Sequence, residues 1–314
     1  LFLLTGRDHR SLQRERITVL GDDYHRSALV MRALRDLITI SKILLKIIKL
    51  MEKTMLTKIF FTLGLATFFS SVHAQQATWN KVDGLRGEAI EYMAYVPEKP
   101  EAAVVVLPGG SWQIGSINPS SNLPDGTNPV IRTIPLMHQK GMAVFLMNKP
   151  VNSPDLSDAQ SRFSQDHGRD VLVVVEQAKK LKVPVYLFGA SYGALSAGAV
   201  LNLTERQGVT GLVMASLTSK RKGSVGLLDF DLSRIDIPTL IIYHQSDECG
   251  SSMPRRVPEL KSAIKNAPSV TVHSISSGSS PSGNVCGPTH WHGFVNAEVE
   301  LISSVGEWMS KNPK

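Results

Sequence analysis

The sequence contains little cysteine, no apolar run long enough to cross a membrane, and no recognisable metal- or phosphate-binding motif. Its apolar segment at residues 59–69 spans 11 positions, whereas a helix needs roughly 20 to cross a bilayer. No cluster of His, Cys, Asp or Glu has the spacing of a metal site. We therefore expect no stable membrane insertion of the chain after this segment, no metal and no other cofactor.

A strong excess of one charge sign is also missing from most of the chain. The formal net charge is +7, but residues 1–74 hold 12 basic and 6 acidic side chains. The remaining 240 residues hold 22 basic and 21 acidic side chains, a net charge of +1. Because the basic character belongs to the N-terminal segment, charge gives no reason to expect a nucleic-acid partner for the rest.

Residues 55–74 have the pattern of a secretory signal peptide. Lys58 precedes the apolar segment, and Val72 and Ala74 are small-type residues ahead of a cleavage point at Gln75. The pattern predicts export to the periplasm or the medium.

The segment before the signal differs in character from the rest of the chain. A secretory signal lies at a natural N-terminus, so we expect residues 1–54 to be an upstream extension outside the natural protein. The alternative is that residues 28–50, which are rich in Ile, Leu, Lys and Arg, form a basic amphipathic helix lying on a membrane. Residues 75–314 are long enough for one large core and are expected to form a single domain.

In the exported part, apolar strand-like segments alternate with helical segments. Strands are expected at 89–96, 102–107, 142–147, 185–188, 209–216, 238–243 and 269–275, and helices at 129–140, 160–181, 194–203, 254–266 and 296–311. This alternation predicts an α/β fold with a doubly wound, mostly parallel sheet. The connection after residue 216 spans about 19 residues, so we expect little or no cap domain and an open site.

The most informative local motif lies in residues 184–194, which read PVYLFGASYGA. A short apolar strand is followed at once by G-x-S-x-G and then by small helix-forming residues, the context that gives this motif its meaning. Gly189 and Gly193 leave room for a strained turn between strand and helix. Ser191 is then held out near a helix N-terminus, which favours negative charge.

Three further positions suited to chemistry follow the ends of predicted strands. Gly109 and Gly110 follow the strand at 102–107, Asp247 follows the strand at 238–243, and His292 comes after the last strand. In an open parallel sheet, ligands bind outside the carboxyl ends of the strands. A serine nucleophile needs a base within hydrogen-bond reach, and the base needs an orienting carboxylate.

Together these motifs resemble the α/β-hydrolase family across residues 75–313. The resemblance rests on GASYG, on the PGG turn after an early strand, on an Asp after a later strand, and on HGF before the last helix. The run HQSDEC at 244–249, with a second Cys before HGF, is similar to small exported bacterial members of this family.

The resemblance implies a role for each of these residues. Ser191 would be the nucleophile, His292 the base and Asp247 the acid. The backbone N–H of Tyr192 would form half of the oxyanion hole. The other half would be the N–H of Gly110 or Ser111, because the turn reads PGG where lipases have HGGG.

The two cysteines, Cys249 and Cys286, both lie in the exported part. An exported chain with two cysteines most simply forms one disulfide. Cys249 is two residues after Asp247 and Cys286 is six residues before His292. Because those side chains must meet, their loops should lie side by side, and we expect a Cys249–Cys286 bond.

Neighbouring residues offer alternatives to the triad. His290 competes with His292 as the base, and Glu248, Asp229 and Asp231 compete with Asp247 as the acid.

Three aromatic or imidazole side chains near the site have open roles. Trp112 and Trp291 either line a substrate pocket or simply pack, and His244 is either a hydrogen-bonded core residue or a functional one.

These features predict an exported serine hydrolase. The primary expectation is a carboxylesterase or lipase-like enzyme that acts on a small-molecule ester through an acyl-enzyme on Ser191. The alternatives are a peptidase or amidase on the same fold, and a binding protein without catalytic activity.

Overall fold

The computed structural model describes residues 32, 34–46 and 76–313, apart from residues 86, 113, 151–155, 204–207 and 220–224. The chain divides into two units, Leu1–His73 and Ala74–Lys314. The described residues of the first unit are helical. The predicted signal peptide lies outside the described residues and stays a prediction.

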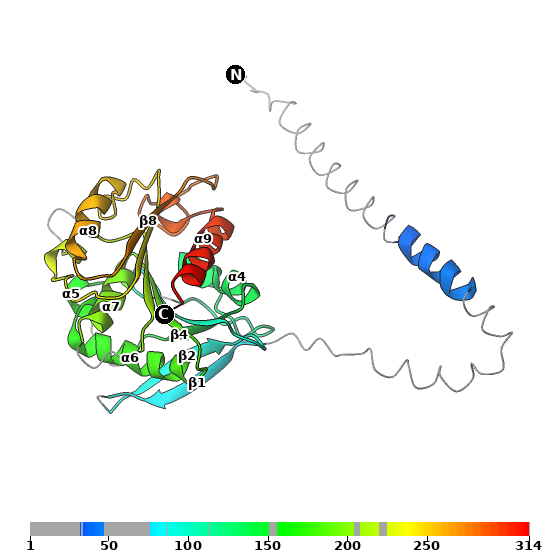
Figure 1. Cartoon of the computed structure of the whole chain (residues 1–314), viewed down its shortest axis with the longest axis horizontal. Helices are drawn as coiled ribbons and strands as arrows, with labels where there is room; N and C mark the ends of the chain where they lie inside the picture. The colour runs from blue at the N-terminus through cyan, green and yellow to red at the C-terminus, as the bar shows by residue number, and fades with distance from the viewer. Residues whose placement is uncertain are drawn as a thin grey trace, which may run out of the picture. The chain divides into compact units, whose positions relative to one another are not determined.

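An eight-stranded sheet organises the second unit (Figure 1). Its strands are β1 (Thr78–Asp83), β2 (Ala89–Tyr95), β3 (Ala102–Leu107), β4 (Met142–Met147), β5 (Val185–Ala190), β6 (Gly211–Ala215), β7 (Thr239–His244) and β8 (Val270–Ile275). Their order across the sheet is β1-β2-β4-β3-β5-β6-β7-β8. The β1–β2 and β2–β4 pairs are antiparallel, and all the other pairs are parallel. The predicted mostly parallel α/β fold is confirmed.

Helices cover both faces of this sheet and close a hydrophobic core on each (Figure 1). One face carries α5 (Ala159–Arg162), α6 (Gln165–Lys179), α7 (Tyr192–Leu201) and α8 (Val257–Ala263). The other carries α3 (Pro129–Arg132), α4 (Ile134–Gln139) and α9 (Glu298–Lys311). The central strands β3, β4, β5 and β6 are buried at every position, as expected for a sheet covered on both sides.

Two predicted helices are interrupted. The helix expected at 129–140 divides at Thr133 into α3 and α4, because Pro135 has no N–H with which to continue the hydrogen-bond ladder. The helix expected at 160–181 divides into α5 and α6, because Ser164 adopts an extended backbone and its hydroxyl caps α6 through the His167 N–H.

The connection after β6 contains little secondary structure in its described part. Between Ser216 and Pro238, the described residues contain one 3-10 helix, η1 (Leu227–Asp229). No cap domain is evident in the described part of this connection, as the sequence predicts. Among the helices that the structure describes, none has both the length and the apolar character needed to span a bilayer.

Candidate active site

Ser191 occupies a strained turn between β5 and α7. Its backbone has φ 54° and ψ −120°, a left-handed φ that a residue other than glycine adopts only under constraint. The strand directly before and the helix directly after it impose this conformation. Ser191 thereby stands at the N-terminus of α7, where unpaired N–H groups and the helix dipole favour negative charge.

The glycines around Ser191 are required by close backbone approaches. A Cβ at Gly189 would run into the Gly193 carbonyl, and one at Gly193 would run into the Leu107 carbonyl. A Cβ at Gly109, in the turn after β3, would lie 3.0 Å from the Ser191 Cβ. These contacts bring the turn after β3 directly against the serine.

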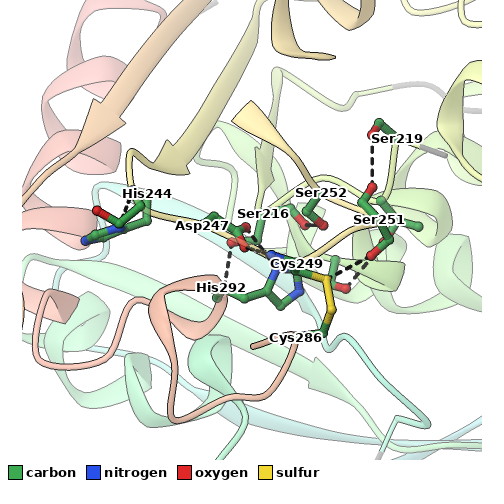
Figure 2. A network of polar contacts seen from close by, with 12 residues as sticks. Ser216, Ser219, His244, Asp247, Cys249, Ser251, Ser252, Cys286 and His292 are labelled. Carbon is green, nitrogen blue, oxygen red and sulfur yellow. Dashed lines mark hydrogen bonds and ion pairs between the residues drawn. A yellow bond between two sulfur atoms is a disulfide. The ribbon is translucent and has the colours of Figure 1, made fainter. Parts of the chain in front are cut away.

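Asp247 and His292 form a buried pair close to the carboxyl end of β7 (Figure 2). His292 Nδ1 lies 3.0 Å from Asp247 Oδ2, and their side chains are 7% and 0% exposed. An ionised carboxylate only accepts hydrogen bonds, so Nδ1 is the protonated nitrogen in this pair. Nε2 is then left with a lone pair, the form that a general base needs.

The alternative residues are exposed or pack against other side chains. Glu248 is exposed, and Asp229 and Asp231 are exposed residues that hold local turns through the N–H groups of Gly226 and Ser233. The hydrogen bonds with Ser233 lower the pKa of the Asp231 carboxyl. His290 precedes η3 (Trp291–Gly293) and packs edge-on against Trp291.

The segment that carries His292, residues 287–294, is held from two sides; we refer to it as the histidine loop. Ser216, directly after β6, donates its hydroxyl to the His292 carbonyl at 2.6 Å. Arg132 donates to the Pro288 carbonyl at 2.9 Å and also to the Gly293 carbonyl, and it pairs with Glu298 at 2.6 Å. These hydrogen bonds fix the backbone on both sides of the imidazole.

Candidate oxyanion donors lie at the start of α7 and in residues 108–111, the oxyanion turn. Tyr192 is the first residue of α7, and the first N–H groups of a helix have no intrahelical acceptor. Gly110 has φ 59° and, like Ser111, lines the cleft that contains Ser191. The arrangement therefore offers backbone donors from both elements.

Ser191 and His292 open into one cleft of about 290 Å³. Its walls come from the oxyanion turn, from the segment before α3, and from the residues around Ser191 and His292. The lining residues are Gly109, Gly110, Ser111, Gly115, Gly126, Thr127, Asn128, Pro129, Ala190, Ser191, Ser216, Cys286, Pro288 and His292. A cleft of this size accommodates a small molecule.

Thr218 is a neighbour of the serine that the sequence analysis did not identify. Its Oγ1 lies 3.3 Å from Ser191 Oγ and is buried, and it is the side-chain hydrogen-bond partner of Ser191 within the described residues. Hydrogen bonds of catalytic groups are often incomplete before substrate binds. The sequence feature that could have identified Thr218 is its position shortly after a central parallel strand.

Trp112 and Trp291 do not line the cleft formed by the described residues. Trp112 is 2% exposed, and its indole N–H donates to the Met147 carbonyl at 2.8 Å. Trp291 stacks on His244 with ring centroids 4.5 Å apart. The geometry thus favours the packing role for both tryptophans over substrate contact.

His244 is a buried structural residue at the end of β7 (Figure 2). Its Nδ1 accepts from the Ser246 N–H at 3.0 Å, so Nε2 carries the proton and donates to the Ser277 carbonyl at 2.9 Å.

The predicted Cys249–Cys286 disulfide is confirmed (Figure 2). Cys249 is fully buried, and its N–H donates to Asp247 Oδ1 at 2.9 Å. Cys286 is exposed and lines the cleft. The bond therefore joins the loop of Asp247 to the segment that leads to His292.

Within the described part of the chain, no three side chains of His, Cys, Asp or Glu lie close enough together to bind one metal ion. The arrangement at the cleft is that of a hydroxyl, an imidazole and a carboxylate.

Comparisons with known proteins show that the fold of this chain is shared by solved structures. No protein-family model and no curated protein sequence matches the chain. Solved structures that match include an esterase of Pyrococcus furiosus (14% identity, TM-score 0.54, covering 77% of this chain and 94% of that one). They also include a cold-adapted esterase from an Arctic intertidal metagenomic library (12% identity, TM-score 0.53, covering 76% and 94%). A third is an α/β serine hydrolase without a lid from Xanthomonas campestris (16% identity, TM-score 0.50, covering 75% and 94%). The chain has the α/β-hydrolase fold.

Proposed function

We propose that the protein is a serine hydrolase that cleaves small-molecule carboxylic esters through an acyl-enzyme on Ser191. The observation that carries the proposal is the buried Asp247–His292 pair, whose imidazole lines one cleft together with a serine held in a strained turn at a helix N-terminus. The fold shared with solved esterases supports the same activity.

The first half of the reaction forms the acyl-enzyme. Ser191 Oγ turns from Thr218 toward His292, and Nε2 takes its proton as the oxygen attacks the ester carbonyl. Asp247 stabilises the resulting imidazolium. The oxyanion of the tetrahedral intermediate accepts hydrogen bonds from Tyr192 N–H and from the oxyanion turn. When the carbon–oxygen bond breaks, the alcohol leaves with the proton from His292.

The second half releases the acid. Water enters the vacated side of the cleft and gives a proton to His292 Nε2 while its oxygen attacks the acyl carbon. The second tetrahedral intermediate uses the same donors. Ser191 Oγ then leaves, takes the proton back from His292, and the carboxylic acid departs.

We further propose that the protein acts outside the cytoplasm. The signal-peptide pattern at residues 55–74 and the Cys249–Cys286 disulfide both support export, because structural disulfides persist in oxidising compartments.

Hydrolysis of p-nitrophenyl esters of increasing acyl length, compared with peptide p-nitroanilides, tests the activity and separates an esterase from a peptidase. We expect turnover of the short esters, loss of that turnover in Ser191→Ala, and no change in Ser262→Ala, whose hydroxyl is exposed on α8. Preferential cleavage of the anilides would favour a peptidase. The absence of hydrolysis in the wild type would favour a binding protein.

A further inference from the structure

Arg162, the last residue of α5, is a fully buried charged side chain with 0% exposure. Its guanidinium carbon lies 4.5 Å from the centroid of the Trp112 ring. Burying a guanidinium costs several kcal/mol unless its N–H groups are paired, so the partners of Arg162 indicate what it does.

Two of the hydrogen-bond acceptors of Arg162 lie on the oxyanion turn. Nη1 donates to the Pro108 carbonyl at 2.8 Å, and Nη2 donates to the Gly110 carbonyl at 2.6 Å. Nε donates to the Leu156 carbonyl, which ties the guanidinium to its own segment. The rigid, planar fork of an arginine can hold two carbonyl groups at once, which the single ammonium of a lysine does less well.

These contacts fix the direction of the peptide groups in the turn. In a planar trans peptide, the N–H points away from the C=O of the same unit. Holding the Pro108 and Gly110 carbonyls toward Arg162 therefore directs the N–H groups of Gly109 and Ser111 away from it. The carbonyl between these two, that of Gly109, accepts from Trp112 N–H at 3.3 Å and from Asn128 Nδ2 at 3.4 Å. Every peptide plane of the turn is thus held.

Arg162 also contacts the helix that supplies the other donor. Nη1 lies 3.2 Å from Ser196 Oγ, which accepts its hydrogen bond. Ser196 is in α7, about one helical turn after Tyr192. His167 Nε2 lies 2.8 Å from the same hydroxyl, so Ser196 is itself held in place.

We propose that Arg162 is a positioning residue for the oxyanion hole, which holds the oxyanion turn and the N-terminus of α7 in a fixed mutual geometry. The inference rests on the proposed function, because it concerns donors that act on the tetrahedral intermediate. It assigns a positioning role to a fully buried charge.

The test compares Arg162→Met and Arg162→Lys with Arg169→Lys, whose arginine lies on the solvent side of α6. Each variant is assayed with p-nitrophenyl butyrate at a temperature well below its own Tm. Inhibition by butylboronic acid is measured in parallel, because its tetrahedral adduct with Ser191 places an oxygen in the oxyanion hole.

Loss of one oxyanion donor lowers kcat by about 10²–10³, and small misplacements of reacting groups can cost about 10². We expect Arg162→Met to lower kcat about 100-fold with KM within threefold, and to weaken boronate inhibition by a similar factor. Arg162→Lys should lower kcat about tenfold, because one ammonium cannot hold both carbonyls as the fork does. Arg169→Lys should match the wild type.

A folded Arg162→Met variant with kcat and boronate inhibition within threefold of wild type would overturn the inference. If neither Arg162 variant folds, Ser196→Ala decides: an unchanged kcat rejects the proposal, and a kcat at least threefold lower with unchanged KM supports it. A wild type without esterase activity would reject the proposed function and this inference together. An active wild type with unaffected variants rejects the inference alone.

Discussion

Asp247 Oδ2 lies 3.0 Å from His292 Nδ1, while the other carboxylate oxygen of Asp247 accepts a hydrogen bond from the Cys249 N–H. The residue that orients the imidazole is thus itself oriented by the backbone of a disulfide-bonded cysteine. The candidate site and the disulfide are therefore joined within one short segment (Figure 2).

Asp247→Asn should leave the fold intact and lower kcat by about 10³–10⁴. An amide can donate to Nδ1, which shifts the ring proton to Nε2 and removes the lone pair that the serine needs. Circular dichroism checks that the fold is intact, and ester hydrolysis measures the decrease in kcat. Glu248→Gln is the matched control: its carboxylate is adjacent in sequence but exposed, and its activity should stay at the wild-type level.

Cys286→Ser should lower both stability and turnover. The bond joins residues separated by 37 positions in the sequence. In the loop-entropy model it reduces the conformational entropy of the unfolded chain and so stabilises the folded state by about 4 kcal/mol. For a domain of this size that corresponds to a decrease in Tm of roughly 10 °C. Because the bond anchors the segment leading to His292, kcat should fall more than KM changes.

Reduction of the wild type with dithiothreitol provides the control for Cys286→Ser. It should reproduce both effects, and reoxidation should reverse them. Full activity and an unchanged Tm after complete reduction, verified by thiol titration, would show that the disulfide does not support the site.

Arg132→Met should weaken catalysis by releasing the histidine loop. The guanidinium joins the Thr127, Pro288 and Gly293 carbonyls to Glu298. Losing the guanidinium leaves the part-buried Pro288 and Gly293 carbonyls without this donor, which lowers the free energy of unfolding by about 1–3 kcal/mol. We expect kcat about tenfold lower, measured with the same esters.

Arg256→Met is the matched control for Arg132→Met. Arg256 forms an exposed i,i+3 ion pair with Glu259 at 3.2 Å, and such pairs contribute about 0–1 kcal/mol. Equal kcat values for the two variants would contradict the proposed role of Arg132.

N-terminal sequencing of material exported by a bacterial host should give Gln75 as the first residue. Replacing Ala74 with a bulky residue should block cleavage and leave an uncleaved precursor, because signal peptidase requires a small residue there. A secreted species that retains residues 1–54 would contradict the prediction.

Much of the fold was predictable because it depends on apolar patterning. The buried strands around β5 appear in the sequence as continuous apolar runs, and the amphipathic helices appear as a 3.6-residue periodicity. The edge strand β1 was not predicted: it pairs only with β2 and is mostly part-exposed, so its side chains carry little hydrophobic pattern.

The sequence also predicted the Asp247–His292 pair and the turn at Ser191, whose roles stay a prediction, but it did not predict the residues that support them. Ser191, Asp247 and His292 each follow a strand end, which places them at one edge of a parallel sheet. Arg132 and Arg162 donate hydrogen bonds to several carbonyl groups far away in sequence, and a carbonyl has no residue signature. The sequence left open whether Trp112 lines a pocket or packs, because its burial depends on tertiary contacts such as the hydrogen bond to the Met147 carbonyl of β4.

Labelling with a fluorophosphonate probe tests the central claim most directly, because the probe reacts only with an activated serine. After labelling and proteolysis, mass spectrometry should find the adduct on Ser191 in the wild type. The adduct should be absent from Ser191→Ala and strongly reduced in Asp247→Asn. Labelling of a different serine, or no labelling of folded wild-type protein, would contradict the proposed nucleophile and with it the assignment of the site.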